Sequence, residues 1–190
     1  MRLGILGGSF DPPHLGHLLA ASDAFEHLEL ERLLFVPAAA QPFKTGTIVA
    51  SPADRMRMVE LTVGTDARFE AERAELDRPG LSYSVDTLTE LSARHPGASF
   101  FLLIGEDLAG QIATWRDAKR LAELASIVVL TRGDASGPPA AATGRYRRLS
   151  TRRVDISSTE IRARVRAGQS IHGFVTDAVA DYIASTGLYR

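Results

Sequence analysis

The chain has 190 residues, of which 45% are hydrophobic and 24% are charged, and its formal net charge is −1. This length suits one compact domain, and the near-neutral charge gives no basis for bulk attraction to nucleic acids or anionic membranes. The sequence has no cysteine, which excludes disulfides, thiolate metal sites and cysteine nucleophiles. The first apolar run is too short for a secretion signal and no stretch is long enough to span a membrane, so we expect a cytoplasmic protein.

Short apolar runs alternate with helical patterns through most of the chain. Apolar side chains recur at helical spacing from Leu15 to Phe25, and Ser51 with Pro52 is typical of a helix start. In chain order, the patterns predict a strand at residues 3–7, a helix from residue 15, a strand at 32–36, a helix at 51–64, a strand at 68–71, a helix at 84–94, a strand at 99–104, a helix at 118–124, strands at 126–130 and about 152–155, a helix opening at 157 and a last helix at about 176–186.

This alternation predicts an α/β fold with a Rossmann-like, doubly wound parallel sheet. We expect a single domain over residues 1–190, with a flexible loop at about 133–145 and a small C-terminal helical part at about 157–190. In such sheets, ligands bind outside the carboxyl ends of the strands. The residues that follow these ends are therefore the first candidates for a binding site.

The loop after the first strand has the residue types of a phosphate site. Gly7 and Gly8 let backbone N–H groups approach a phosphate closely, and the start of the following helix adds positive potential. His14 and His17 are three residues apart at that helix start, so they lie on one face, and Gly16 between them leaves room for a ligand. Two imidazoles placed there can donate hydrogen bonds to non-bridging oxygens as charge develops in a transition state.

Other uses of this loop have less support. A zinc site would need a third ligand, and the remaining histidines have no metal-site spacing with His14 and His17. The glycines fit neither the G-x-G-x-x-G pattern nor a Walker A motif, which disfavours an ordinary dehydrogenase or P-loop ATPase.

A second segment near the other end of the chain has complementary chemistry. Ser157 and Ser158 offer hydroxyls and backbone N–H groups at a helix start, and Arg162 lies about one turn further on, as a fork-shaped donor. This arrangement predicts a cradle for a polyphosphate. Simple helix capping with a solvated arginine is the alternative.

The two segments carry a resemblance to a known family. Gly-Gly-Ser-Phe-Asp-Pro-Pro-His-Leu-Gly-His at residues 7–17 resembles the signature of the H-x-G-H nucleotidyltransferases, and Ile-Ser-Ser-Thr-Glu-Ile-Arg at 156–162 resembles their I-S-S-T-x-I-R element. Within that superfamily the chain is similar to bacterial nicotinate-nucleotide adenylyltransferases over essentially its whole length. The segments that carry this similarity are residues 42–44, 82–88, 105–107 with Trp115, and 179–189.

The resemblance implies adenylyl transfer from ATP to nicotinate mononucleotide, giving deamido-NAD and pyrophosphate, in NAD biosynthesis. The implied catalytic residues are His14, His17, Lys44 and Arg162. The implied ATP-binding residues are Gly7, Gly8, Ser9, Phe10, His17, Gly105, Asp107, Ile156, Ser157, Ser158 and Arg162. The implied residues for the mononucleotide are Gly8, Ser9, Lys44, Tyr83, Ser84, Trp115, Arg116 and Arg132. Mg²⁺ is expected to come with ATP, held by substrate oxygens, with no metal held by the protein.

Several positions depart from the family pattern or have a simpler explanation. Phe43 stands where histidine is frequent, Ser84 where threonine is common, and Arg116 where an aromatic residue is often seen. Trp115 could instead be a tryptophan at the edge of the core, Lys44 a solvated lysine and Asp107 a helix cap.

Three other functions remain as alternatives. They are a sibling enzyme such as a phosphopantetheine adenylyltransferase or a cytidylyltransferase, a non-catalytic nucleotide-binding module, and an RNA-binding protein that uses the arginines of residues 145–166. The neutral net charge disfavours RNA, so we expect neither a nucleic-acid nor a membrane partner. Formation of a homo-oligomer and the choice between nicotinate and nicotinamide mononucleotide stay open.

Overall fold

The computed structural model describes residues 1–39, 48–132 and 146–190. The elements in chain order are β1 (Arg2–Gly8), α1 (Leu15–His27), β2 (Arg32–Pro37), α2 (Pro52–Val63), β3 (Phe69–Ala71), α3 (Ser84–Arg94), β4 (Ser99–Gly105), α4 (Glu106–Ala109), the 3-10 turn η1 (Ile112–Thr114), α5 (Ala118–Leu124), β5 (Ala125–Arg132), β6 (Tyr146–Thr151), α6 (Ser158–Arg166) and α7 (Asp177–Thr186). The loop expected at 133–145 lies outside the described residues.

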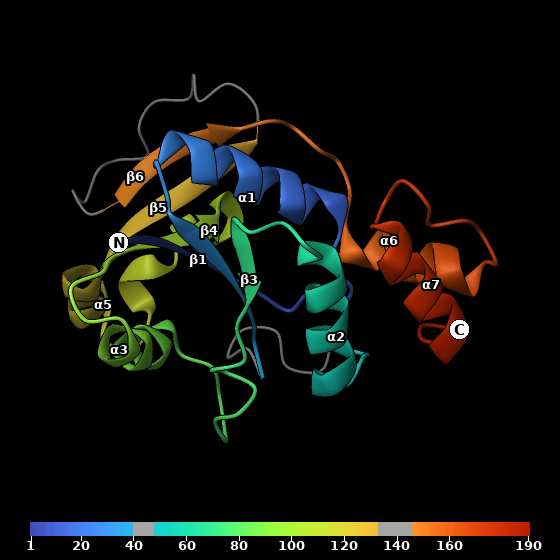
Figure 1. Cartoon of the computed structure of the whole chain (residues 1–190), viewed down its shortest axis with the longest axis horizontal. Coiled ribbons are helices and arrows are strands. Elements are labelled where there is room, and N and C mark those ends of the chain that lie inside the picture. Colours follow the sequence, from blue (N-terminus) through green and yellow to red (C-terminus); the bar gives the residue numbers. More distant parts are fainter. Residues whose placement is uncertain (40–47, 133–145) are drawn as a thin grey trace.

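The described strands form one parallel sheet in the order β3-β2-β1-β4-β5-β6. Successive side chains of a strand point to opposite faces, and both faces are apolar here. One face packs under α1 and α2 through side chains such as Leu6, Phe35 and Val59, and the other under α3 and α5 through Ile5 and Leu88 (Figure 1). This is the predicted Rossmann-like, doubly wound fold.

The order of the strands reverses between β1 and β4. The chain leaves β1 toward α1 on one face and leaves β4 toward α4 and α5 on the other. Loops that diverge in this way leave space outside the carboxyl ends of the two strands, which is where sheets of this type bind ligands. The loop of Gly7 and Gly8 and the strand end at Gly105 lie at this edge.

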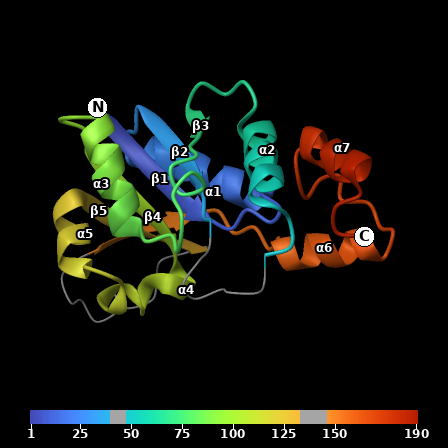
Figure 2. The same cartoon turned by 90° about the horizontal axis from the view of Figure 1, so that it is seen from below.

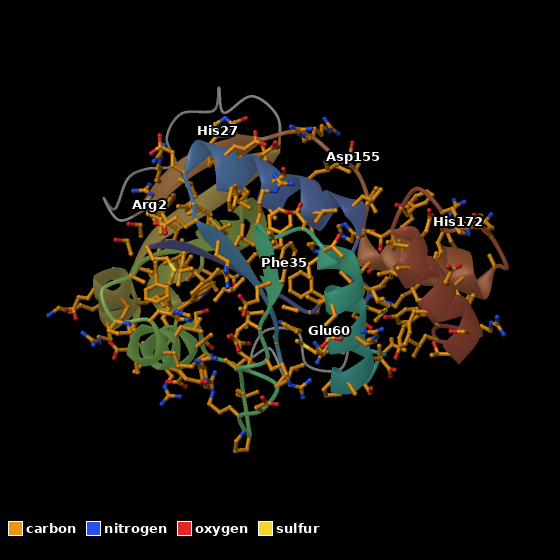
Figure 3. The ribbon with its side chains drawn as sticks, in the orientation of Figure 1. Arg2, His27, Phe35, Glu60, Asp155 and His172 are labelled. Atoms are coloured by element: carbon orange, nitrogen blue, oxygen red, sulfur yellow. The ribbon has the colours of Figure 1, made fainter. Side chains whose placement is uncertain are left out.

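A third apolar cluster holds α6 and α7 to α2. It contains Met58 of α2, Ile161 of α6, and Val179 and Ile183 of α7. Figure 2 shows α6 and α7 together beside α2, on the side away from α3 and α5. Because α2 also contributes Val59 to the cluster under the sheet, it joins the C-terminal helices to the rest of the fold. Figure 3 shows Phe35 inside the molecule and His172 at its outer edge.

The strand expected at about 152–155 is wrong. The last strand of the sheet is β6, and residues 152–157 are outside helices and strands. The backbone N–H of Arg152 donates to the carboxylate of Asp23 at 2.8 Å, and the side chain of Arg152 pairs with the same carboxylate. The segment is therefore bound to α1 by an ion pair, where a strand would use its N–H groups in a ladder. Among the described residues, no helix has the length and apolar character needed to cross a membrane.

Candidate active site

The loop after β1 folds tightly over the sheet edge. A side-chain carbon at Gly8 would lie 3.1 Å from the ring of Phe10, so that ring covers the glycine closely, whereas a side chain at Gly7 would meet only open space. Phe10 itself has a φ of 47°, which residues with side chains rarely adopt, and it is 1% exposed. Its ring packs against that of His17 with 5.0 Å between centroids. The loop thus has an open backbone at Gly7 and a buried aromatic anchor below.

The two histidines form a stacked pair at the start of α1. His14 is the N-cap residue, and its ring lies on that of His17 with 3.7 Å between centroids. The backbone N–H of His14 donates to Nδ1 of His17 at 3.2 Å. Because Nδ1 accepts, a neutral His17 carries its proton on Nε2. The predicted shared face is therefore observed.

Gly16 serves the histidine pair in a way that differs from the expectation. A side-chain carbon there would lie 3.0 Å from the ring of His14, and 3.7 Å from Val154. The space that the missing side chain leaves is thus beside the imidazole. Gly16 therefore leaves room for the ring of His14 at the start of the helix, whereas the sequence predicted room for a ligand there.

The second motif meets the first. Ser157 caps α6 at the predicted helix start by accepting from the N–H of Glu160 at 3.1 Å, which is the capping named as the alternative role. The hydroxyl of Ser158 donates to the carbonyl oxygen of Pro12 at 2.8 Å, and Nη1 of Arg162 donates to the carbonyl oxygen of Asp11 at 2.7 Å. The start of α6 therefore binds the first loop directly, across most of the length of the chain.

Arg162 keeps donors for a ligand. Its side chain is 13% exposed, its Nη1 lies 3.7 Å from the carboxylate of Asp11, and its Nη2 donates to the hydroxyl of Thr159 at 3.3 Å. Among the described residues, Nε of Arg162 has no hydrogen-bond partner. Since a guanidinium has five N–H groups in a planar fork, groups remain that can bind phosphate oxygens. Ile156, the first residue of the motif, packs against the apolar cluster of α6 and α7.

The end of β4 lies beside the first loop, because β4 pairs with β1. Gly105 is the N-cap residue of α4, and Asp107 is exposed in the first turn of that helix. A side-chain carbon at Gly105 would lie 2.6 Å from Oδ1 of Asp107, so a larger residue there would displace the Asp107 carboxylate. The structure thus brings Gly105 and Asp107 to the same sheet edge as the expected phosphate residues.

A second group of predicted residues gathers on the α3 and α5 side. Tyr83 is the N-cap residue of α3 and Ser84 its first residue. Trp115 and Tyr83 are partly buried against the same apolar cluster, which fits the simpler explanation of Trp115 as a tryptophan at the edge of the core. The guanidinium of Arg116 lies 4.7 Å from the centroid of the Tyr83 ring and 3.3 Å from the carboxylate of Asp86. Any role in binding the mononucleotide stays a prediction for these residues.

Two of the predicted residues cannot be placed in the site in the same detail. Lys44, with Phe43 beside it, lies outside the described residues. Arg132 is the last residue of β5, so its backbone lies at the carboxyl edge of the sheet. The backbone of Ser9 lies at the same edge, where its carbonyl oxygen accepts from Nη1 of Arg55 at 2.8 Å.

Sequence reasoning missed a buried polar network below the first loop. Asp11, Arg55 and Tyr189 are 1%, 0% and 5% exposed, and the hydroxyl of Tyr189 donates to Oδ1 of Asp11 at 2.8 Å. Burial, reinforced by the Asp11 carboxylate, raises the pKa of Tyr189, while burial lowers the pKa of Arg55. The available signal was Arg55 itself, a charged residue on the buried face of α2 beside Met56 and Met58.

A buried glutamate under the start of α3 was also missed. Glu75 accepts from the hydroxyl of Thr87 at 2.8 Å, and burial raises its pKa against the opposing effect of its hydrogen bonds with Ser82 and Thr87. The hydroxyl of Ser82 in turn accepts from the N–H of Ala39, at 2.9 Å. These bonds tie the segment before Tyr83 to the loop after β2. Within the described ranges, no group of three or more His, Asp or Glu side chains is arranged to hold a metal ion.

Comparisons with known proteins place the chain in a family. Residues 5–164 match the model of the cytidylyltransferase-like family. The chain is 50% identical to a protein of Gemmatimonas aurantiaca named probable nicotinate-nucleotide adenylyltransferase, over 100% of this chain and 93% of that protein. It is 46% identical to a protein of the same name from Thermus thermophilus, over 100% of both chains.

Solved structures show the same fold at lower identity. The Plasmodium falciparum nicotinic acid mononucleotide adenylyltransferase complexed with NaAD matches with a TM-score of 0.80 at 20% identity, covering 99% of this chain and 97% of that one. The match in fold extends over the whole chain, and the sequence relatives give the family. The chain thus belongs to the cytidylyltransferase-like family and, within it, to the nicotinate-nucleotide adenylyltransferases.

Proposed function

We propose that the chain transfers the adenylyl group of ATP to nicotinate mononucleotide, forming deamido-NAD and releasing pyrophosphate in NAD biosynthesis. The family and the relatives named for this reaction support the activity. The observation that carries the assignment to a site is the contact between the two motifs. Arg162 and Ser158 donate to the carbonyl oxygens of Asp11 and Pro12, so the imidazoles and the guanidinium converge at one edge of the sheet.

Positioning and charge stabilisation are sufficient for this reaction. The 5′-phosphate of the mononucleotide is ionised at neutral pH, so its oxygen can attack the α-phosphorus of ATP without a general base. His14 and His17 donate hydrogen bonds to the α-phosphate as charge builds there, with Nε2 of His17 as the donor. Arg162 binds the departing pyrophosphate through its remaining N–H groups. The bond from the 5′-phosphate oxygen to phosphorus forms as the bond to pyrophosphate breaks.

Lys44 has the same role in this proposal as in the sequence-based expectation. It lies outside the described residues, so its contribution to the departing pyrophosphate rests on the family pattern alone. Gly7, Gly8, Ser9 and Phe10 contribute backbone N–H groups at the end of β1.

The mononucleotide is assigned to the α3 and α5 side of the sheet edge. Tyr83, Ser84, Trp115 and Arg116 lie there together, and the backbone and side chain of Ser84 at the start of α3 suit a carboxylate. Trp115 offers an aromatic plane for the pyridinium ring. Arg116 would have to exchange its pairing with Asp86 for the substrate carboxylate, which makes it a secondary contact.

Mg²⁺ enters this proposal as part of the ATP substrate. The side chains that converge on the site are imidazoles and a guanidinium, which suit phosphate oxygens, whereas Mg²⁺ prefers oxygen ligands. Bound to the triphosphate, the ion would offset its negative charge. A cytoplasmic location belongs to the same proposal, since ATP and mononucleotides are cytoplasmic metabolites.

Pyrophosphate release with separate acceptors tests the function. The purified chain is incubated with MgATP and, in parallel, with nicotinate mononucleotide, nicotinamide mononucleotide, phosphopantetheine or no acceptor, and CTP replaces ATP in a second series. We expect release with ATP and nicotinate mononucleotide above every other pair. Release with phosphopantetheine, release with CTP only, or ATP binding without any release would each refute the proposal.

A matched pair of variants tests the site. Arg162→Ala removes the guanidinium that contacts the first loop, and Arg166→Ala removes an exposed one from the last residue of the same helix. Loss of a charge-assisted donor to the pyrophosphate should lower kcat/KM for ATP by about 100-fold in Arg162→Ala, and by less than about twofold in Arg166→Ala. Equal effects in the two variants would remove Arg162 from the site.

A further inference from the structure

The carboxylate of Asp11 joins four segments of the chain at one buried point. Its Oδ1 accepts from the N–H of Ala50 at 2.9 Å and from the hydroxyl of Tyr189 at 2.8 Å. Its Oδ2 accepts from the N–H of Val49 at 2.8 Å and lies 3.7 Å from Nη1 of Arg162. The first loop, the approach to α2, α6 and the segment after α7 therefore meet at one side chain that is 1% exposed.

The charges at this point do not balance. Arg55 donates to the carbonyl oxygen of Ser9, and its charge interacts with that of Asp11, so two guanidinium groups flank one carboxylate. Burial and the neighbouring carboxylate raise the pKa of Tyr189, which keeps the phenol neutral and acting as a donor. A surplus of positive charge remains directly beneath the loop to which the triphosphate is assigned, and it favours an anion there.

The distances around Asp11 show how its charge is shared. The phenol is at hydrogen-bond distance from the carboxylate, while Arg162 is at 3.7 Å, beyond a direct bond. Nη1 of Arg162 instead donates to the backbone carbonyl oxygen of Asp11, at 2.7 Å. A buried carboxylate is unstable without hydrogen-bond donors. If Asp11 lost the hydroxyl of Tyr189, the nearest group that could replace it as a donor is the guanidinium of Arg162.

The backbone at Tyr189 supports a functional reason for this contact. Its φ is 68°, in the left-handed region that residues with side chains rarely adopt. Such a conformation persists where the surroundings determine it, and here it directs the phenol to Asp11, with Sδ of Met58 at 4.0 Å from the hydroxyl.

We propose that Tyr189 and Asp11 are positioning residues for the transfer reaction: the hydroxyl of Tyr189 engages the carboxylate of Asp11, so that this carboxylate anchors the first loop without drawing Arg162 away from the triphosphate. Without the phenol hydroxyl, Asp11 closes the 3.7 Å ion pair with Arg162 into a direct hydrogen bond. The guanidinium then turns from the ligand and its charge is partly neutralised. This inference rests on the proposed function, since it concerns the binding of ATP by Arg162.

Single and double variants separate this mechanism from general loosening of the structure. In Tyr189→Phe, loss of one charge-assisted contact to the triphosphate should raise KM for ATP about tenfold, with kcat changed by less than about threefold. Adding Asp11→Asn to Tyr189→Phe removes the charge that captures Arg162. The double variant should therefore have a KM for ATP at least about threefold below that of Tyr189→Phe, even though it is the less stable protein.

The chain offers a matched control. Tyr182→Phe removes the same kind of bond, from a phenol to the carboxylate of Asp54 at 2.8 Å, away from the first loop. We expect KM for ATP to stay within about twofold of the parent in Tyr182→Phe. Thermal unfolding of all variants shows which are folded at the assay temperature. Loss of one hydroxyl removes only a small part of the free energy of unfolding, so KM for ATP is measured at a reduced temperature at which Tyr189→Phe is folded.

Failure of the positioning role and failure of the proposed reaction give different results in these assays. An unchanged KM for ATP in Tyr189→Phe, or a double variant worse than Tyr189→Phe, would overturn the positioning role while the parent remains active. Absence of pyrophosphate release from the parent itself would instead refute the proposed reaction.

Discussion

Ile161 is the side chain through which α6 is expected to be held in place. It is 0% exposed in the cluster that joins α6 and α7 to α2. Ile161→Ala removes three carbon atoms, which at about 0.8 kcal/mol each gives about 2.4 kcal/mol, before any cavity. With the cavity left behind, we expect a loss of about 3 kcal/mol in the free energy of unfolding. For a chain of this size, that loss lowers Tm by about 6–12 °C.

The activity should fall with the packing, because the next residue is Arg162 and Ser158 begins the same helix. A small displacement of α6 misplaces both donors, and we expect kcat/KM for ATP to fall about tenfold or more at a temperature where the variant is still folded. Val165→Ala is the control, since Val165 is only partly buried in the same cluster one turn later. Calorimetry and pyrophosphate release measure the two effects. A Tm loss no larger than that of the control, or full activity despite a lowered Tm, would refute the reasoning.

Three further outcomes are expected. His17→Ala should lower kcat at least ~100-fold by removing a preorganised donor, and near-parent turnover would exclude the imidazole from the mechanism. Burial raises the pKa of Glu75, so the stability that its protonated form contributes is present below the ordinary pKa of 4.5 and is lost as pH rises through the raised value. The free energy of unfolding, measured in urea from acid to neutral pH, should therefore depend less on pH in Glu75→Gln than in the parent. The same pH dependence in both proteins would contradict this. Burial opposes ionisation of Asp23, but its bonds with Arg152 prevail and lower its pKa. The stability that the Asp23 carboxylate contributes is therefore present above pH 3.8 and is lost as pH falls through the lowered value. The difference in the free energy of unfolding between the parent and Asp23→Asn should shrink in acid, and a constant difference would argue against the ion pair.

The fold was accessible from the sequence because its signals are local. Apolar runs that end at glycines marked β1 and β4, and Ser51 with Pro52 marked the start of α2, where the hydroxyl of Ser51 accepts from the N–H of Asp54. The last strand was misplaced because Tyr146–Thr151 contains two consecutive arginines and few apolar residues, as suits an outer strand. Its inward residues, Leu149 and Thr151, are too few for periodicity to detect.

The site was accessible only in part. The histidine pair and the start of α6 follow from spacing within one helix each, without any knowledge of the contact between them. The role of Asp11 could not be found in this way, since its partners Val49, Arg162 and Tyr189 are distant in sequence and no period links them. The role of Gly16 was also not predictable from spacing, because a side chain at this position would crowd the ring of His14, and only the structure shows where that ring lies.

The outermost strands of the sheet constrain how copies of the chain can associate. In the described part of the chain, the sheet ends at β3, which has three residues, and at β6, whose Arg147 is exposed. Two molecules that joined their sheets through β6 would bring the Arg147 guanidinium of each copy to the seam, and a three-residue strand offers too few backbone groups for a stable seam. Aggregation by strand addition is thereby opposed at both margins of the sheet.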